Sequence, residues 1–240
     1  MKYYIGIDLG GTNIKGAVVS ETGEILRQSS CPTRAEAGAA AVTESIANMI
    51  NDLAAGREIS GVGMGCPGTV DDAGGTVVYA CNLGWMHYDV RAALREKTGF
   101  SVRLVNDANA AALAEVKAGC AKGAQSAVVV TLGTGVGGGV DGRTAFLAQQ
   151  QGDAAGSAVV GEYVHYLSIG VANIVNIFFP EVVAVSGGVS NQGENLLAPL
   201  RQAVSQQEYG AAYTTRHPRI LRCILGNDAG VIGAALFAEE

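Results

Sequence analysis

The chain has 240 residues, of which 48% are hydrophobic, 16% are charged and 34 are glycines, and its formal net charge is −6. This composition is typical of a compact protein with many tight turns and excludes a disordered chain. The negative charge gives no general attraction to nucleic acid or to an anionic membrane surface. We find no apolar run of the roughly 18 residues that a membrane helix needs and no signal peptide, so we expect a cytoplasmic protein.

Apolar periodicity predicts an α/β protein in which strands and helices alternate. Strands are expected at 3–8, 15–19, 61–65, 102–105, 127–132, 182–186 and 219–225, and helices at 37–54, 89–98, 108–118, 154–178, 194–206 and 229–238. The segments "YIGIDLGGTNIKGAVV" and "AVVVTLGTGVGGGV" resemble one another, each being a strand that leads through Leu-Gly into a glycine turn. This similarity predicts two related α/β halves with a ligand in the cleft between them.

The first glycine turn, "DLGGTNIK", has the features of a phosphate-binding hairpin. Asp8 ends an apolar strand, and Gly10 and Gly11 allow a sharp turn in which backbone N–H groups converge on an anion. Asp8 would hold a magnesium ion through water, while Thr12 offers a hydroxyl and Lys15 a cation to the phosphates. A plain hairpin would also explain the two glycines, and the Walker pattern GxxxxGK[ST] is absent.

The second glycine turn, "TLGTGVGGG", formally contains the dinucleotide pattern G-x-G-x-x-G at Gly133, Gly135 and Gly138. A dinucleotide fold needs a helix directly after this turn, and the residues that follow do not favour one. A second phosphate-binding hairpin fits better, to which Thr131 and Thr134 would add hydroxyl donors.

The stretch "VNDANAAALAE" places Asn106 and Asp107 at the end of a strand and the start of an alanine-rich helix. Helix capping explains both residues, but a carboxylate at this position is also where a general base belongs. In "CNLGW", Asn82 and Gly84 precede the single tryptophan, Trp85. An ordinary loop explains this stretch, and a polar substrate contact from Asn82 beside an apolar platform is the functional alternative.

Two further features give weaker signals. In "VSGGVSNQG", Gly187 and Gly188 follow a strand and would let the backbone approach a flat adenine or ribose closely. The cysteines are odd in number, scattered and never in C-x-x-C spacing, which favours reduced thiols over a disulfide framework or a metal site. They are Cys31, Cys66, Cys81, Cys120 and Cys223.

The ordered set of motifs resembles the ROK (repressor/ORF/kinase) family of sugar kinases over nearly the whole chain. The matching motifs are DxGGTxxK, "GMGCPGTVD", N-x-x-W, NDANAAALAE, TxGTGxGGG and "NIFFPEVVAVSGGVS". The resemblance implies the actin-like ATPase (ribonuclease H-like) fold, with two related domains around a cleft. It implies a small N-terminal domain at 1–122, on which a C-terminal helix at 227–240 packs, and a larger domain at 123–226 shortened near 140–142.

The resemblance also implies an ATP- and Mg²⁺-dependent transfer of the γ-phosphate to a hexose hydroxyl in a cytoplasmic homodimer that binds neither nucleic acid nor membrane. Glucose, at its 6-hydroxyl, is the expected sugar, ahead of N-acetylmannosamine, N-acetylglucosamine, fructose and allose. Asp107 matches the family's catalytic aspartate, and Asn82, Gly84, Asn106 and Asp107 match its sugar side. The nucleotide side matches Asp8, which also holds the metal, and Gly10, Gly11, Thr12, Lys15, Thr131, Gly133, Thr134, Gly135, Gly187 and Gly188.

The chain departs from the family in "GVGGGVDGRTAF", residues 135–146. Family members carry several dozen residues between the second hairpin and the helix that begins here at Thr144. That segment holds a sugar-contacting G-E-x-G-H motif and a C-x-C-G-x-x-G-C cluster that binds structural zinc, so we expect the zinc motif to be absent here. Glu162 and His165 of "GEYVH" are in E-x-x-H order, but their neighbours match a later helix, which favours coincidence.

Three functions therefore remain open. The chain is an active sugar kinase, or a nucleotide-binding protein that has lost sugar phosphorylation, because the departure affects the sugar side. A DNA-binding repressor is the least favoured, since no helix-turn-helix precedes the first strand.

Overall fold

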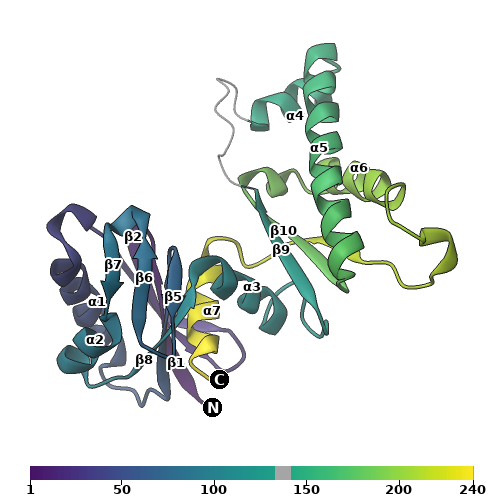
Figure 1. Ribbon diagram of the computed structural model, residues 1–240. Coiled ribbons are helices and arrows are strands. Elements are labelled where there is room, and N and C mark those ends of the chain that lie inside the picture. The colour runs from purple at the N-terminus through teal and green to yellow at the C-terminus, as the bar shows by residue number, and fades with distance from the viewer. Residues whose placement is uncertain (133–141, 240) are drawn as a thin grey trace. The chain divides into compact units, whose positions relative to one another are not determined.

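The computed structural model describes residues 1–132 and 142–239, which form two compact units (Figure 1). Unit 1 comprises Met1–Gly119 and Asn227–Glu240, and unit 2 comprises Cys120–Gly226.

Unit 1 is built on a five-stranded sheet with the order β3-β2-β1-β4-β8, beside which β5, β6 and β7 form a small antiparallel sheet. Strands β1, β4 and β8 run parallel, so their carboxyl ends lie at one edge of the large sheet. The strands are β1 (Tyr3–Leu9), β2 (Asn13–Ser20), β3 (Ile25–Pro32), β4 (Gly61–Cys66), β5 (Thr69–Asp71), β6 (Thr76–Ala80), β7 (Trp85–Tyr88) and β8 (Val102–Asn106). The helices are α1 (Ala39–Ala54), α2 (Val90–Thr98), α3 (Asp107–Lys117) and α7 (Ala229–Phe237), with a 3₁₀ turn at Cys81–Leu83.

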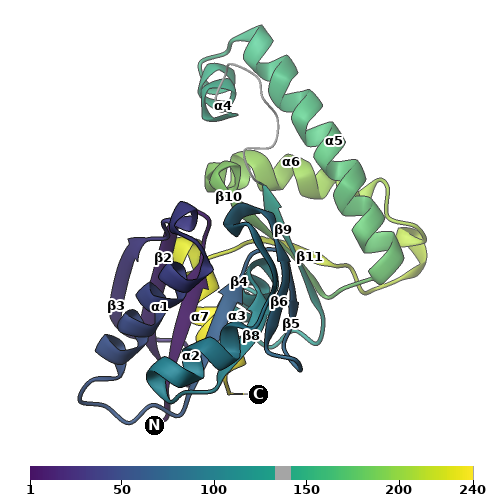
Figure 2. The same ribbon diagram turned by 60° about the vertical axis from the view of Figure 1, so that its left-hand side comes forward.

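Helices cover both faces of the large sheet of unit 1. Apolar residues of α1 and α2, among them Ile46, Ile50 and Leu94, join the buried side chains of β1, β4 and β8 in one core. On the other face α7 lies against β1 and β4, as Figure 2 shows. Glycines allow this close approach, because a Cβ built on Gly63 would lie 1.9 Å from the Ala234 carbonyl oxygen.

Unit 2 contains a three-stranded parallel sheet with the order β11-β10-β9. Its strands are β9 (Ala127–Leu132), β10 (Val182–Gly187) and β11 (Arg219–Arg222), and its helices are α4 (Gly142–Gln150), α5 (Ala154–Phe178) and α6 (Glu194–Ser205), with 3₁₀ turns at Gly188–Gln192 and Ala211–Tyr213. Val171 and Val175 of α5 pack with Val183 of β10 and Leu200 of α6, and Phe146 of α4 packs on the other end of α5.

Helix α5 corrects one expectation about apolar runs. Among the described residues it is the one helix long and apolar enough to span a membrane, with a mean hydropathy of 1.3 over its best 18-residue window. The search for apolar runs missed it because Glu162 and His165 interrupt the helix. The finding is weak evidence for a membrane span, since a core helix passes the same test, and one face of α5 lies in the core of unit 2.

The periodicity identified the long elements but missed β3 and the three strands of the small sheet. Strand β3, "ILRQSSCP", is exposed along most of its length and therefore lacks an apolar pattern. Strands β5, β6 and β7 are three to five residues long, which is too short for a period to be recognised. Helix α4 begins at Gly142, two residues before the predicted start at Thr144.

Candidate active site

Two carboxylates meet at the carboxyl edge of the unit 1 sheet. Asp8 lies near the end of β1, and Asp107 is the first residue of α3, directly after β8. Burial is the main cause that raises the pKa of Asp8, and the negative charge of Asp107 raises it further. The positive charge of Lys15 acts in the opposite direction. Between them β4 ends at the fully buried Cys66, whose thiol pKa is raised by burial and by both carboxylates. The fold thus concentrates negative charge in one partly buried place, which makes this place a candidate functional site.

The raised pKa of Asp8 predicts that this carboxylate lowers stability at neutral pH. The folded protein favours the protonated form, so the ionised form becomes costly as the pH rises above the usual pKa of an aspartate. We expect Asp8→Asn to raise the free energy of unfolding by on the order of 1 kcal/mol at pH 7 and by little near pH 3. Urea titrations at the two pH values measure this, with the exposed Glu21→Gln as the control. A variant less stable than wild type at pH 7 would contradict the prediction.

The first glycine turn has the exposed hairpin geometry that a phosphate-binding loop needs. Gly11 and Thr12 are exposed between β1 and β2, and the Gly10 N–H donates to the Asn13 carbonyl at 3.0 Å. The buried Thr33, which sequence reasoning missed, holds this turn: its hydroxyl donates to the Gly10 carbonyl at 2.6 Å and its N–H to the Thr12 carbonyl at 2.8 Å. Strands β2 and β3 pair as far as Asn13 and Pro32. Thr33, the residue after Pro32, is therefore next to the turn.

Two other predicted residues of unit 1 lie near this turn. Lys15 donates from Nζ to the Asn227 carbonyl at 2.9 Å, so part of its hydrogen-bonding capacity ties β2 to the start of α7. Asn82 is exposed, and a Cβ on Gly11 would lie 3.2 Å from the Asn82 Cβ, which places Asn82 against the glycine turn. Gly84 ends the Cys81–Leu83 turn with a φ of +65°, a conformation that favours glycine.

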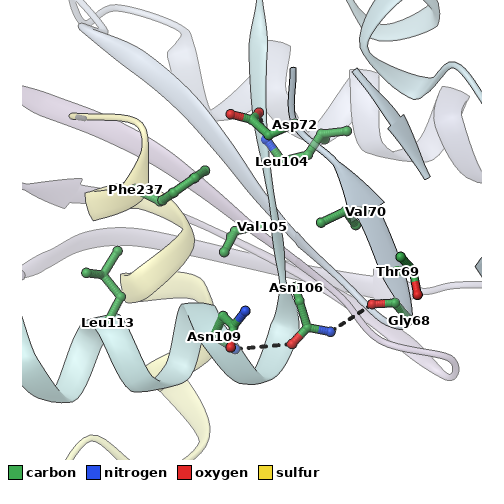
Figure 3. Close-up of a pocket in the computed structure, with 10 residues that line it drawn as sticks. All are labelled: Gly68, Thr69, Val70, Asp72, Leu104, Val105, Asn106, Asn109, Leu113 and Phe237. Atoms are coloured by element: carbon green, nitrogen blue, oxygen red, sulfur yellow. Dashed lines mark hydrogen bonds between the residues drawn. The ribbon is translucent and has the colours of Figure 1, made fainter. Parts of the chain in front are cut away.

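Asn106 has a structural role as the N-cap of α3, which its sequence context also predicted. Its side-chain oxygen accepts from the N–H groups of Ala108 and Asn109 at 3.0 and 3.2 Å, which caps α3. Its amide group donates to the Gly68 carbonyl at 2.9 Å, as Figure 3 shows. Asn106 therefore joins the helix that begins with Asp107 to the turn before β5.

A cavity of about 580 Å³ opens beside Asn106 along the edge of β8. Its walls come from β5, β8, α3 and α7, all within unit 1 (Figure 3). The lining residues are Gly68, Thr69, Val70, Asp72, Leu104, Val105, Asn106, Asn109, Leu113 and Phe237. Among the described residues of the predicted site, Asn106 lines the cavity, whereas Asp8 and Asp107 do not.

Unit 2 brings together three of the predicted nucleotide residues, Thr131, Gly187 and Gly188. Thr131 pairs with Ser186, and a Cβ on Gly187 would lie 2.0 Å from the Leu132 carbonyl oxygen, so β9 and β10 end side by side. Gly187 has a φ of +95°, and a Cβ on Gly188 would meet nothing within 4 Å. The predicted residues Gly133, Thr134 and Gly135 lie outside the described part of the chain.

The expectation that this chain has no counterpart of the family's zinc motif is wrong. Glu115, Cys120 and Cys223 place one carboxylate oxygen and two sulfur atoms within 4.8 Å of one another. Thiolate and carboxylate donors suit zinc. Spacing arguments missed the group because Cys120 and Cys223 are far apart in the sequence, and because Glu115 stands near the end of α3, where a glutamate is an ordinary helix residue. The three side chains also correct the interpretation of Cys120 and Cys223 as scattered thiols.

The model of the ROK family matches this chain over residues 4–145 and again over 140–240. The chain belongs to the ROK family. The two matches meet at the stretch where the sequence departs from the family pattern, which supports a missing segment at that point.

The similarity to two curated glucokinases extends over nearly the full length of both proteins. The glucokinase of Halalkalibacterium halodurans is 27% identical over 317 aligned positions, covering 100% of this chain and 96% of the relative. That of Thermotoga maritima is 29% identical and covers 98% of this chain and 97% of the relative. An alignment of 317 positions against 240 residues means that the first relative carries several dozen residues that this chain lacks.

Solved structures of ROK proteins share the fold. A ROK glucokinase from Streptomyces griseus, in complex with glucose and AMPPNP, is 26% identical with a TM-score of 0.77, and the match covers 99% of both chains. A ROK hexokinase from Thermus thermophilus is 29% identical with a TM-score of 0.83, covering 99% of this chain and 98% of the other. The fold is therefore the α/β actin-like fold of ROK glucokinases, as the motifs predicted.

Proposed function

We propose that this ROK protein is an ATP-dependent hexose kinase that phosphorylates glucose at its 6-hydroxyl. The carboxylate pair of Asp8 and Asp107 at the carboxyl edge of the sheet carries the proposal, because it supplies both a base and a metal-binding group. Full-length similarity to two glucokinases supports the choice of glucose.

In the proposed reaction Asp107 orients the sugar hydroxyl and accepts its proton. A bond forms between the sugar oxygen and the γ-phosphorus as the bond from that phosphorus to the bridging oxygen breaks, and ADP leaves. Asp8 fits a magnesium ion, since its oxygens are hard ligands in a negatively charged place, and the ion would neutralise phosphate charge. On the sugar side, Asn82, Gly84 and Asn106 would surround the hexose.

The nucleotide side of the proposal uses glycine turns in both units. The exposed backbone of Gly11 and Thr12 would donate N–H groups to the phosphates, Gly10 would shape the turn through its bond to Asn13, and Lys15 would add its charge. Gly188 leaves open space for a flat ring beside β10. The set of residues that we assign to ATP is completed by Thr131, Gly133, Thr134, Gly135 and Gly187.

A specific observation favours a second candidate function. The residues missing relative to the Halalkalibacterium glucokinase fall where family members carry a sugar-contacting segment, so the chain would bind nucleotide without phosphorylating sugar. Calorimetry with Mg·ATP and a coupled ADP-release assay separate the two. The kinase predicts ADP release that depends on glucose, N-acetylmannosamine, N-acetylglucosamine, fructose or allose. Binding of ATP with no response to any sugar would favour the second function.

We further propose that the protein is a cytoplasmic homodimer that contacts neither nucleic acid nor membrane. Helix α5 supports the dimer, because Val159, Tyr166 and Ile169 of this apolar helix are exposed within unit 2. Light scattering after gel filtration is expected to give twice the chain mass of 24.5 kDa at micromolar concentration. A mass of one chain would contradict the dimer.

A further inference from the structure

A carboxylate next to the small sheet of unit 1 binds three donors from two neighbouring elements. Asp72 directly follows β5 and accepts hydrogen bonds from the Leu104 N–H at 2.7 Å, from Arg103 Nε at 2.7 Å and from an Arg91 Nη at 2.5 Å. Burial alone would raise the pKa of Asp72, but these three donors outweigh it and lower the pKa. The side chain is 27% exposed, so the ion pairs are partly shielded from water.

These contacts take the place of a neighbouring strand at the edge of the large sheet. Strand β8 is the last strand of its sheet, and Asp72 binds its Leu104 N–H while Arg91 Nε donates to its Val102 carbonyl at 2.7 Å. Arg103 also lies over the Phe237 ring, at 4.6 Å from the ring centroid. Asp72 is therefore the centre of a cluster that holds together β5, β8, α2 and α7.

The same segment is attached to β8 at a second point. Gly68 lies four positions before Asp72, and its carbonyl accepts the hydrogen bond from Asn106. Both attachments line the cavity in Figure 3, Asp72 at one end and Gly68 with Asn106 at the other. Gly68 lies close against the backbone of β6, because a Cβ there would lie 2.1 Å from the Tyr79 carbonyl oxygen. Two attachments fix both the position and the direction of residues 68–72 along β8.

This arrangement connects Asp72 to the residues that we assign to the sugar. Asn106 caps α3 and thereby holds Asp107 at the first helical position. The turn at Gly68 leads through β5 and β6 to Asn82. Of the two attachments of the β5–β6 hairpin to β8, loss of the one at Asp72 would leave the Gly68–Asn106 hydrogen bond.

We propose that Asp72 is a positioning residue for the sugar side of this site, acting through Gly68 and Asn106. The inference rests on the proposed kinase function. Asp72 touches no reacting atom, and its effect is on the geometry of the acceptor hydroxyl relative to Asp107. A displacement of the acceptor hydroxyl relative to Asp107 lowers the rate of phosphate transfer to the sugar more than it weakens nucleotide binding.

The test compares Asp72→Asn with Glu44→Gln. Glu44 pairs with Lys97 at 2.6 Å and joins α1 to α2, so its replacement also removes a carboxylate–cation contact of unit 1 outside this cluster. We expect Asp72→Asn to lower kcat/KM for glucose about tenfold to a hundredfold, with KM for ATP changed less than about twofold. Glu44→Gln is expected to leave both parameters within about twofold of wild type.

Hydrogen exchange gives a readout that does not depend on activity. In Asp72→Asn the amides of residues 68–72 and 104–109 are expected to exchange faster than in Glu44→Gln at equal thermal stability. Unchanged exchange in these segments, or parallel losses for glucose and ATP, would overturn the inference. If wild type phosphorylates no sugar, the proposed function fails, and the exchange experiment alone still decides whether Asp72 fixes the hairpin.

Discussion

Replacement of Asp107 by asparagine is expected to lower glucose-dependent turnover by about 10²- to 10⁴-fold, the usual contribution of a general base. The amide keeps the size of the carboxylate but cannot accept the proton of the attacking hydroxyl. Binding of Mg·ATP is expected to persist, because Asp107 acts on the sugar. Steady-state ADP release and calorimetry with ATP measure the two effects separately.

The thermal stability of the Asp107→Asn protein is the control for its loss of activity. The Asp107 side chain also accepts a hydrogen bond from the Ala108 N–H at 2.8 Å, and an asparagine oxygen can replace it. Asn106 continues to cap α3. The thermal midpoint should therefore stay within a few degrees of wild type. Undiminished turnover in a folded variant would remove Asp107 from the assigned role.

Gly63→Ala is expected to cost about 3 kcal/mol of unfolding free energy, because the added methyl group has no space. Its Cβ would lie 1.9 Å from the Ala234 carbonyl oxygen, and a helix backbone cannot move aside as a side chain can. Helix α7 would have to separate from β4, which exposes apolar surface of unit 1. The midpoint of urea unfolding measures this cost.

Gly65→Ala is the matched control on the same strand. A Cβ at Gly65 would lie 3.5 Å from the Ala110 Cβ, an ordinary contact. We expect this variant to unfold within about 1 kcal/mol of wild type. Equal midpoints for the two variants would contradict the close packing of α7 on β4.

Much of the fold was predictable because its central elements are long and regularly patterned. Strands β1, β4 and β8 and helix α5 have clear apolar periods, and their order, together with the motifs, predicted the actin-like fold that the ROK structures share. The exposed β3 and the short strands β5 to β7 have no such period. Their arrangement depends on tertiary contacts, such as those of Asp72, that no local pattern encodes.

The site was predictable where a turn or a strand end marks it. Asp8 lies near the end of one apolar strand and Asp107 follows another, and the structure brings their charges together. Thr33 and Asp72 escaped notice, because a polar residue after a strand is usually solvated and nothing in the sequence shows which backbone groups it will meet. The grouping of Glu115, Cys120 and Cys223 likewise depends on the folded chain.

The most direct test of the proposed function is a ³¹P NMR spectrum of the protein incubated with Mg·ATP and glucose. The kinase predicts a new phosphate-ester signal that grows in step with ADP, and no ester in the Asp107→Asn sample. The absence of an ester in the wild-type sample, with ATP either intact or converted to ADP and inorganic phosphate, would contradict the account.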